Sequence, residues 1–368
     1  MKIGILTFHY GYNYGGVLQA YALQEYIRHQ GHDVSIINYI PLSYKVDFLY
    51  GISRRYPLLS LKHVVGNLLH QKNSIKTFED FRSKYLNTTL KTISIAELEQ
   101  TCKDFDIIIV GSDQVWNPGQ HDKKIYFLDF NLNRTTKKIS YAACCTVNEV
   151  SEVNRKTLES ALDRFDSISV RNRETQRFVS DLVRRESEIV LDPTFLWNFD
   201  EMLYLSVKQD KYILTYIIGS DIDGNNAKAI RKIKSEYGNM PVFAIIIGAV
   251  AGVIHVPWAD KVIYDASPIE WLNYIKNAYL LFTDSFHGVV FAIKFKTKFI
   301  GYYKEHLRAS RFIDLKNTYQ LDKYIINTSK DIKAVSDSEF TNKLAEIEKI
   351  NNKKLTESIK FISNSILR

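Results

Sequence analysis

The sequence predicts an α/β protein with two Rossmann-like domains that face each other across a cleft. At 368 residues the chain is longer than one typical hydrophobic core, so we expect two domains. Short apolar runs alternate with stretches of helical spacing, an order that is typical of parallel sheets. Several of these runs end in polar clusters, and open parallel sheets bind ligands at the carboxyl ends of their strands.

The chain begins with a βαβ unit. Lys2–Phe8 is a predicted strand, Val17–His29 has the apolar spacing of a helix, and Val34–Ile40 is the next strand. The intervening loop, His9–Gly16, lacks the GxGxxG pattern, and no acidic residue follows the second strand to hold a ribose. A dinucleotide site is therefore not expected.

The same loop is a candidate sugar-binding segment. Gly15 lets the backbone approach a ligand closely. The side chains before it can stack on a sugar or form hydrogen bonds with it; these residues are Tyr12, Asn13 and Tyr14. The alternative is that the glycines only serve the turn, although loops on rigid scaffolds often carry function.

Four further strands of the first half end in polar residues. They are predicted at Phe105–Val110, Lys138–Ala143, Ser167–Val170 and Ile189–Leu191, with a helix around Glu152–Phe165. The residues after the first of them are candidate ligand contacts, namely Ser112, Asp113, Gln114, Trp116 and Asn117. Ser112 and Asp113 could equally cap a helix. Arg171 follows the third strand, so these strand ends together predict one continuous cleft.

The second half repeats the pattern. Strands are predicted at Lys211–Gly219, Pro241–Gly248, Lys261–Tyr264, Tyr279–Thr283 and Lys298–Tyr303, with a helix over Ala227–Glu236. We predict a first domain over residues 1–200, a second over residues 201–335 and a helical tail over residues 336–368. The boundary between the domains is expected near Trp197–Lys208.

The stretch Tyr279–Ile293 reads as a buried strand, a tight turn and a helix that begins near Gly288. His287 then lies at the carboxyl end of a parallel strand beside a helix N-terminus, where unpaired N–H groups attract anions. The upstream helix begins with a capping box, because Ser267 is followed by a proline and, three residues on, by Glu270. From position alone, His287 could equally cap its helix or pack in the crossover.

The composition is that of a globular protein with a formal net charge of +8. This surplus fits an anionic substrate or a membrane surface, and a general solubility charge explains it equally well. No nucleic-acid-binding motif accompanies the charge, so no nucleic acid partner is expected. No apolar run approaches the roughly 20 residues of a spanning helix, and the first residues begin a strand rather than a signal peptide.

The three cysteines are Cys102 and the adjacent pair Cys144-Cys145. None has CxxC spacing and a vicinal pair is a poor disulfide framework, so a reducing cytoplasm is expected. We read the pair as a wall of the site rather than as a nucleophile. No His, Asp and Glu cluster has metal-ligand spacing.

The segment Ser53–Gln71 has helical spacing of leucines with basic residues among them. It is either an interfacial helix that brings the protein to lipid-linked substrates or an ordinary amphipathic helix packed on its domain.

Several motifs occur in an order that resembles one family. They are GSDQVWNP (Gly111–Pro118), SYAA (Ser140–Ala143), SVR (Ser169–Arg171), LDPTFL (Leu191–Leu196), SPIEWL (Ser267–Leu272) and TDSFHG (Thr283–Gly288). With the opening TFHYGYNYGGVLQAYAL, they resemble the polysaccharide pyruvyl transferase family over about residues 1 to 315.

The resemblance implies a fold of the glycosyltransferase B type and a pyruvyl transfer from phosphoenolpyruvate to a sugar. The product is a ketal across two hydroxyls, and phosphate is released without a cofactor or a metal. The acceptor implied is a sugar, commonly galactose, of a bacterial capsular or cell-surface polysaccharide, often as a lipid-linked repeat unit. The first domain would bind it, in the cytoplasm or at the inner face of the cell membrane.

This chemistry needs a general acid for the methylene carbon and cations for a carboxylate and a phosphate. His287 is the candidate acid, with Ser285 and Gly288 beside it as donor contacts. Arginine forks suit both anions, and the candidates are Arg171, Arg308 and Arg311. Where some family members carry an arginine two residues before the histidine, this chain has Ser285.

Two other hypotheses stay open. A glycosyltransferase using a nucleotide sugar on the same fold would need a ribose-binding carboxylate in the second domain. Glu270 could be mistaken for one, but its place in the capping box explains it more simply. A non-catalytic sugar- or nucleotide-binding module would make His287 dispensable.

Overall fold

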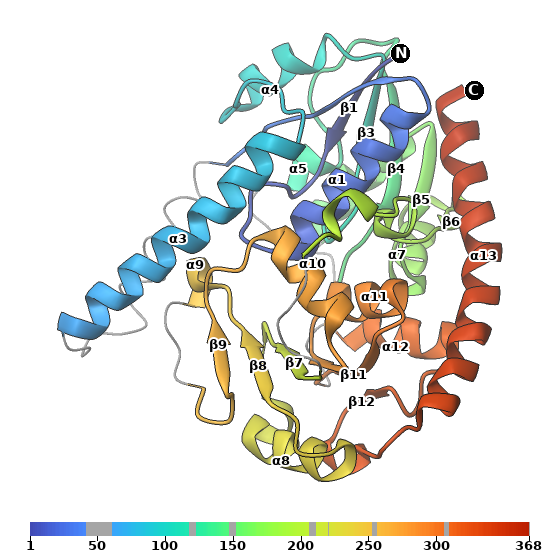
Figure 1. Ribbon diagram of the computed structural model, residues 1–368. Coiled ribbons are helices and arrows are strands. Elements are labelled where there is room, and N and C mark those ends of the chain that lie inside the picture. Colours follow the sequence, from blue (N-terminus) through green and yellow to red (C-terminus); the bar gives the residue numbers. More distant parts are fainter. Residues whose placement is uncertain are drawn as a thin grey trace.

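The computed structural model describes residues 1–41, 61–117, 123–146, 152–205, 211–219, 221–251, 256–304 and 309–367. Its described part contains two six-stranded sheets with helices packed around them (Figure 1). Every strand pairing in both sheets is parallel. The predicted fold class, two Rossmann-like units, is therefore confirmed.

The first sheet has the strand order β2-β1-β3-β4-β5-β6. The strands are β1 (Lys2–Leu6), β2 (Asp33–Ile36), β3 (Ile107–Val110), β4 (Lys137–Ala143), β5 (Ser167–Val170) and β6 (Glu188–Ile189). The helices are α1 (Tyr14–His29), α3 (Leu61–Tyr85), α4 (Ile95–Cys102), α5 (Lys123–Tyr126), α6 (Glu152–Asp163) and α7 (Arg173–Val183). The central strand β3 is wholly apolar and buried, as expected for a strand covered on both faces.

The second sheet has the order β12-β11-β10-β7-β8-β9. Its strands are β7 (Ile213–Tyr216), β8 (Val242–Ile245), β9 (Lys261–Ile263), β10 (Leu280–Thr283), β11 (Lys298–Tyr302) and β12 (Ile325–Ile326). The helices are α8 (Asn226–Tyr237), α9 (Gly248–Ala251), α10 (Pro268–Asn277), α11 (Phe286–Phe295), α12 (Ala309–Tyr319) and α13 (Asp337–Leu367). The capping box predicted for α10 is present, with Glu270 Oε2 accepting from Ser267 N at 2.8 Å.

Two helices next to the site, α1 and α11, start earlier than predicted. α1 begins at Tyr14 rather than at Val17, because the side chain of Asn13 accepts from Gly16 N and caps the helix earlier. α11 begins at Phe286, so His287 lies in its first turn rather than in the preceding corner. Helices α4, α5, α7, α9 and α12 and the short strand β12 were not predicted.

The predicted amphipathic segment Ser53–Gln71 falls partly on residues 53–60, which lie outside the described residues. The described helix α3 starts at Leu61 and continues well past Gln71, to Tyr85. Among the helices that the structure describes, none combines the length and the apolar character that crossing a bilayer requires.

The two sheets share one hydrophobic cluster, which contains buried residues from both halves of the chain. Tyr14 of α1 stacks on Trp271 of α10 with ring centroids 5.1 Å apart, and its hydroxyl donates to Ala266 O at 2.8 Å. Phe78 of α3 stacks on Tyr14 at 4.9 Å. This apolar contact brings the first turn of α1 against the second domain.

The C-terminal helix α13 runs along one side of the molecule past both sheets (Figure 1). Phe340 at its start contacts Tyr324 at a ring distance of 5.9 Å, beside the second sheet. Near its end, Ser358 Oγ accepts from Leu191 N at 2.9 Å, and Phe361 contacts Tyr141 of β4 at 6.4 Å. The helix therefore holds the segment that follows β6.

Replacing Ser358 by alanine is expected to destabilise the protein by about 1–3 kcal/mol, because the buried Leu191 N–H loses its acceptor. Thr356→Ala is the matched control, since that exposed hydroxyl donates within its own helix, to Asn352 O. Its cost should stay within about 0.5 kcal/mol. Denaturant unfolding of both variants measures the difference, and equal midpoints would show that the Leu191 bond contributes nothing.

Candidate active site

His287 is held at the end of β10 by a chain of local hydrogen bonds. Thr283 Oγ1 donates to Tyr216 O and accepts from Ser285 N, and Ser285 Oγ accepts from Gly288 N at 3.2 Å. A Cβ on Gly288 would lie 2.9 Å from Thr283 Oγ1, so the turn needs glycine there. The predicted donor contacts Ser285 and Gly288 thus build the cap of α11, and His287 is fixed with 5% of its surface exposed.

The first turn of α1 packs against the imidazole ring. A Cβ on Gly15 would lie 2.1 Å from His287 Nδ1, closer than any real contact. Gly15 was predicted as a sugar contact, but the structure places it directly against His287 of the other domain. Gly15 therefore allows α1 to pack closely against His287, rather than allowing the backbone to approach a ligand.

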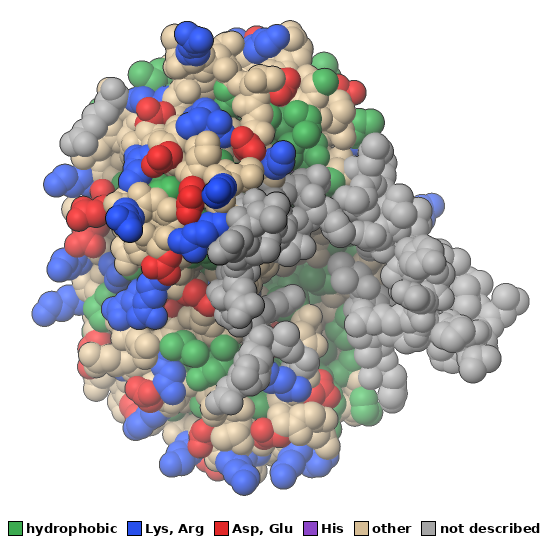
Figure 2. All heavy atoms as spheres, turned by 180° about the vertical axis from the view of Figure 1, so that it is seen from behind, with side chains coloured by type: hydrophobic (Ala, Val, Ile, Leu, Met, Phe, Trp, Pro, Cys, Tyr) green, Lys and Arg blue, Asp and Glu red, His purple; other side chains and the backbone are tan. Residues whose placement is uncertain are grey.

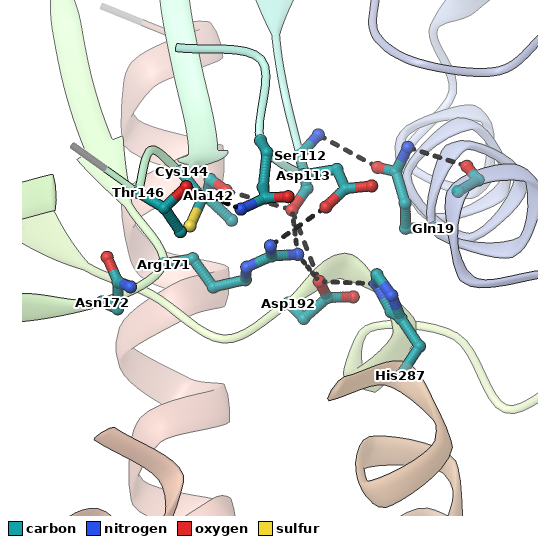
Figure 3. Close-up of polar contacts among 12 residues, drawn as sticks. Gln19, Ser112, Asp113, Ala142, Cys144, Thr146, Arg171, Asn172, Asp192 and His287 are labelled. Atoms are coloured by element: carbon teal, nitrogen blue, oxygen red, sulfur yellow. Dashed lines mark hydrogen bonds and ion pairs between the residues drawn. The ribbon is translucent and has the colours of Figure 1, made fainter. Parts of the chain in front are cut away.

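A buried network on the first sheet faces the other side of His287 (Figure 3). Arg171 follows β5 and donates to Asp192 Oδ2 at 2.8 Å and to Asp113 Oδ1 at 3.1 Å. His287 Nε2 lies 3.4 Å from the same Asp192 oxygen, an ion-pair distance without the geometry of a hydrogen bond. Asp192 therefore joins the arginine of one domain to the histidine of the other.

The sequence reasoning missed Asp192 as a site residue, although it noted the LDPTFL motif. Its second oxygen, Oδ1, accepts from Thr194 N at 3.1 Å and from Thr194 Oγ1 at 2.8 Å, so the carboxylate is fixed. Burial acts to raise the pKa of Asp192, but the influence of the neighbouring His287 and Arg171 outweighs it and holds that pKa well below its usual range. The sequence feature that could have identified Asp192 is its position: it is a carboxylate just after a strand, at the same sheet edge as Arg171.

Asp192→Asn is expected to destabilise the protein by about 3–5 kcal/mol at neutral pH, because Arg171 loses a buried partner. Because the pKa of Asp192 is lower in the folded state, its ionised carboxylate stabilises the fold at pH values above about 3.9, the pKa in the unfolded chain. This stabilisation is lost as the pH falls from there through the pKa of the folded state. The melting temperature of the variant should therefore fall less steeply below pH 4 than that of the wild type. Asp129→Asn, which breaks the more exposed pair with Arg164, is the control.

A pocket lies between the two sheets beside this network. The residues that matter here come from both domains and from α13, namely Arg171, Asn172, Phe286, Arg311, Asp314 and Lys354. The guanidinium carbons of Arg171 and Arg311 lie 4.6 Å and 5.5 Å from the centroid of the Phe286 ring. The structure thus brings together His287, Arg171 and Arg311 of the predicted donor residues; Arg308 lies outside the described residues.

Two predicted acceptor residues are core residues, which corrects their assignment. Tyr14 is fully buried in the contact between the domains, and Trp116 is fully buried with its Nε1 donating to Tyr126 O at 2.9 Å. Neither ring has a surface for a ligand. Ser112 is also buried, where its hydroxyl donates to Ala142 O at 3.0 Å within the network that contains Arg171.

The other predicted acceptor residues retain some exposure. Tyr12 is half-buried with the guanidinium of Arg82 over its ring at 5.4 Å, and Asn13 is exposed while it caps α1. Asp113 is half-buried against Arg171. Gln114 and Asn117 are half-buried as well, and Gln114 Nε2 donates to Thr146 Oγ1 at 3.3 Å.

Cys144 and Cys145 are both buried at the end of β4. Burial raises the pKa of the Cys145 thiol, with Cys144 adding to the effect. Among the described residues, no group of three or more His, Cys, Asp and Glu side chains is arranged to hold a metal ion. On the face that Figure 2 shows, basic and acidic side chains are interspersed over both domains.

Two parallel sheets, with a pocket between them at the ends of their strands, define a fold of the glycosyltransferase B type. A glycosyltransferase of kitacinnamycin is 11% identical with a TM-score of 0.50, over 99% of this chain and 98% of that one. S. aureus MnaA in a structure with UDP is 11% identical with a TM-score of 0.55, over 100% and 98%. The UDP-GlcNAc 2-epimerase of Methanocaldococcus jannaschii, in complex with UDP-GlcNAc and UDP, is 13% identical with a TM-score of 0.51, over 96% and 94%. At such identities the likeness concerns the fold alone.

The family model of polysaccharide pyruvyl transferase matches residues 13–306. The chain therefore belongs to the polysaccharide pyruvyl transferase family and is an enzyme, as the motifs predicted. No curated protein is significantly similar to it. His287, Arg171 and Asp192 lie within the matched range, whereas Arg311 and Lys354 lie beyond its end.

Proposed function

We propose that the enzyme transfers the pyruvyl group of phosphoenolpyruvate to a sugar, with galactose as the expected acceptor, of a bacterial capsular or cell-surface polysaccharide repeat unit. The product is a pyruvate ketal, and phosphate is released. The observation that carries the proposal is the meeting of His287 with the buried Arg171–Asp192 pair beside a pocket that also contains Arg311. Arg171, Asp192 and Arg311 line this pocket, and His287 contacts Asp192 at its edge. A potential acid beside two guanidinium groups is what an unsaturated phosphate ester with a carboxylate requires.

In the proposed reaction the imidazole of His287 gives a proton to the methylene carbon of phosphoenolpyruvate. The neighbouring carbon becomes an oxocarbenium-like centre, and a sugar hydroxyl oxygen bonds to it and loses its proton. The bond from this carbon to the phosphate oxygen then breaks, and the electron pair leaves with the phosphate. The second sugar hydroxyl attacks the same carbon and loses its proton, which closes the ketal.

Each buried group has a role in this scheme. Asp192, fixed by Thr194, keeps the imidazole oriented and stabilises a positive charge on it. Arg311 binds an anionic group of the donor, because the arginine fork suits both carboxylate and phosphate. Arg171, whose terminal nitrogens bond Asp192 and Asp113, contributes its charge and its Nε. No cofactor or metal is called for in these steps.

The acceptor is proposed to bind on the side of the first domain. Tyr12 and Asn13 before α1, and Gln114 and Asn117 after β3, retain exposed surface near the edge where the strands end. A lipid-linked repeat unit would reach them at the inner face of the cell membrane, in the cytoplasm. The half-exposed Tyr12 ring is the candidate for stacking on the sugar.

The test is phosphate release from phosphoenolpyruvate with and without a panel of galactose-terminated synthetic or lipid-linked glycans. We expect release that depends on the acceptor, and a glycan that gains the mass of pyruvate less one water. Turnover of a nucleotide sugar, with no release from phosphoenolpyruvate across the panel, would overturn the proposal in favour of a glycosyltransferase.

A further inference from the structure

We infer that the C-terminal helix α13 contributes Lys354 to a phosphate subsite in this pocket, completed by the side-chain amide of Asn172 and by Arg311. The pocket is lined by all three residues. The inference rests on the proposed function for the identity of the donor, whose phosphate group would occupy the subsite. Lys354 and Arg311 both lie beyond the part of the chain that the family model matches.

Two buried donors at this pocket have no partner among the described residues. Asn172 is 2% exposed, and its Oδ1 accepts from Thr175 N at 3.0 Å, which fixes the orientation of the amide. Its Nδ2 then faces no acceptor, and Arg171 Nε lacks one as well. Buried polar groups without partners cost free energy, so two of them at one pocket indicate that a ligand supplies the acceptors.

The charge of the pocket favours an anion. The carboxylate of Asp192 is matched by Arg171, while Arg311 and Lys354 also line the pocket and add positive charge. The carboxyl of Asp314 also lines the pocket, but burial raises its pKa against the opposing influence of Arg173 and Lys354. Outside the set of cations assigned to the subsite, Arg173 Nε lies 3.9 Å from Asp314 Oδ1 and pairs with this carboxyl.

The arrangement of the donors suits phosphate better than carboxylate. Asn172 precedes α7, Arg311 lies in the first turn of α12 and Lys354 lies on α13, so donors from three different elements line the pocket. A flat carboxylate accepts mainly in one plane, whereas the oxygens of a tetrahedral phosphate point to several sides.

The register of α13 places Lys354 at this position. Ser358 Oγ accepts from Leu191 N at 2.9 Å and donates to Lys354 O at 2.7 Å, one helical turn earlier. Leu191 is the residue before Asp192, so the helix that carries Lys354 also holds the carboxylate that faces His287. The backbone of α13 at Lys354 is thus fixed by hydrogen bonds to the segment that carries Asp192.

The experiment is calorimetric titration of the full-length protein with inorganic phosphate, the expected product, and with acetate as a carboxylate probe. Lys354→Met is expected to weaken phosphate binding about 10–100-fold, the loss of one charge-assisted hydrogen bond. Lys353→Met removes the same charge from an exposed neighbour, whose side chain is 81% exposed, and should leave the affinity unchanged. Asn172→Asp keeps an acceptor for capping α7 but replaces the amide donor, so it should also weaken binding.

The inference is overturned if the wild type does not bind phosphate, if Lys354→Met binds it like Lys353→Met, or if the variants lose acetate rather than phosphate. Binding is measured without turnover, so the outcome is separate from that of the proposed reaction. If phosphate binding depends on Lys354 but phosphoenolpyruvate is not turned over, the phosphate subsite is supported and phosphoenolpyruvate is rejected as the donor. Turnover with an unchanged KM for phosphoenolpyruvate in Lys354→Met would reject the subsite alone.

Discussion

Replacing His287 by glutamine is expected to lower kcat for phosphate release by about 10²–10⁴-fold, the usual contribution of a general acid. Glutamine can still place a polar group opposite Asp192, so the buried carboxylate keeps a hydrogen-bonding neighbour. It cannot give a proton to the methylene carbon. The loss should therefore appear in kcat, whereas the KM for phosphoenolpyruvate, which depends on the cations, should change much less.

His9→Gln is the matched control for this prediction. His9 is also buried, at the carboxyl end of the first strand, and its ring contacts Thr7 O and Asn38 Oδ1, both at 3.1 Å. Burial lowers the pKa of His9, which suits a neutral structural role. We expect this variant to lose thermal stability but to keep kcat within a few fold. A His287→Gln protein with the wild-type kcat would show that another group protonates the donor.

The features that the sequence predicted are mainly local ones. His287 could be placed at the carboxyl end of a strand because an apolar run and a glycine occur within a few residues, although the helix starts before His287 rather than after it. Arg171 could be placed because it directly follows a strand with β-branched residues. In both cases the residue type and the sequence position define where the side chain lies in a parallel sheet.

The features that the sequence did not predict depend on contacts between distant segments. Tyr14 and Trp116 look like exposed loop aromatics, but Tyr14 stacks on Trp271 and Trp116 on Phe127, so both are in the core. Asp192 follows a two-residue edge strand, and its role is visible only once His287 approaches it from the other domain. Lys354 resembles any other lysine of a long surface helix until α13 is seen to pass the pocket.

Replacing Gly15 by alanine is expected to lower kcat by about 10²-fold or more and to destabilise the protein by about 1–3 kcal/mol. The added Cβ would lie 2.1 Å from His287 Nδ1, so the imidazole must leave its place or α1 must move away from α11. Either shift separates His287 from Asp192, whose position is fixed separately by Thr194 and Arg171. Steady-state kinetics and thermal unfolding of the purified variant measure both effects.

Gly16→Ala provides the matched control, because it adds the same methyl group one residue further along the same helix. The nearest atom to a Cβ on Gly16 is Phe8 O at 3.4 Å, an ordinary contact. That substitution should stabilise the protein by about 0.4–1 kcal/mol, since alanine restricts the unfolded chain more than glycine does, and it should leave kcat unchanged. The pair therefore isolates one contact between the domains. A Gly15→Ala enzyme with the wild-type kcat would mean that catalysis takes place with α1 withdrawn from His287, and the roles assigned to Arg171 and Asp192 would then have to be tested in that open arrangement.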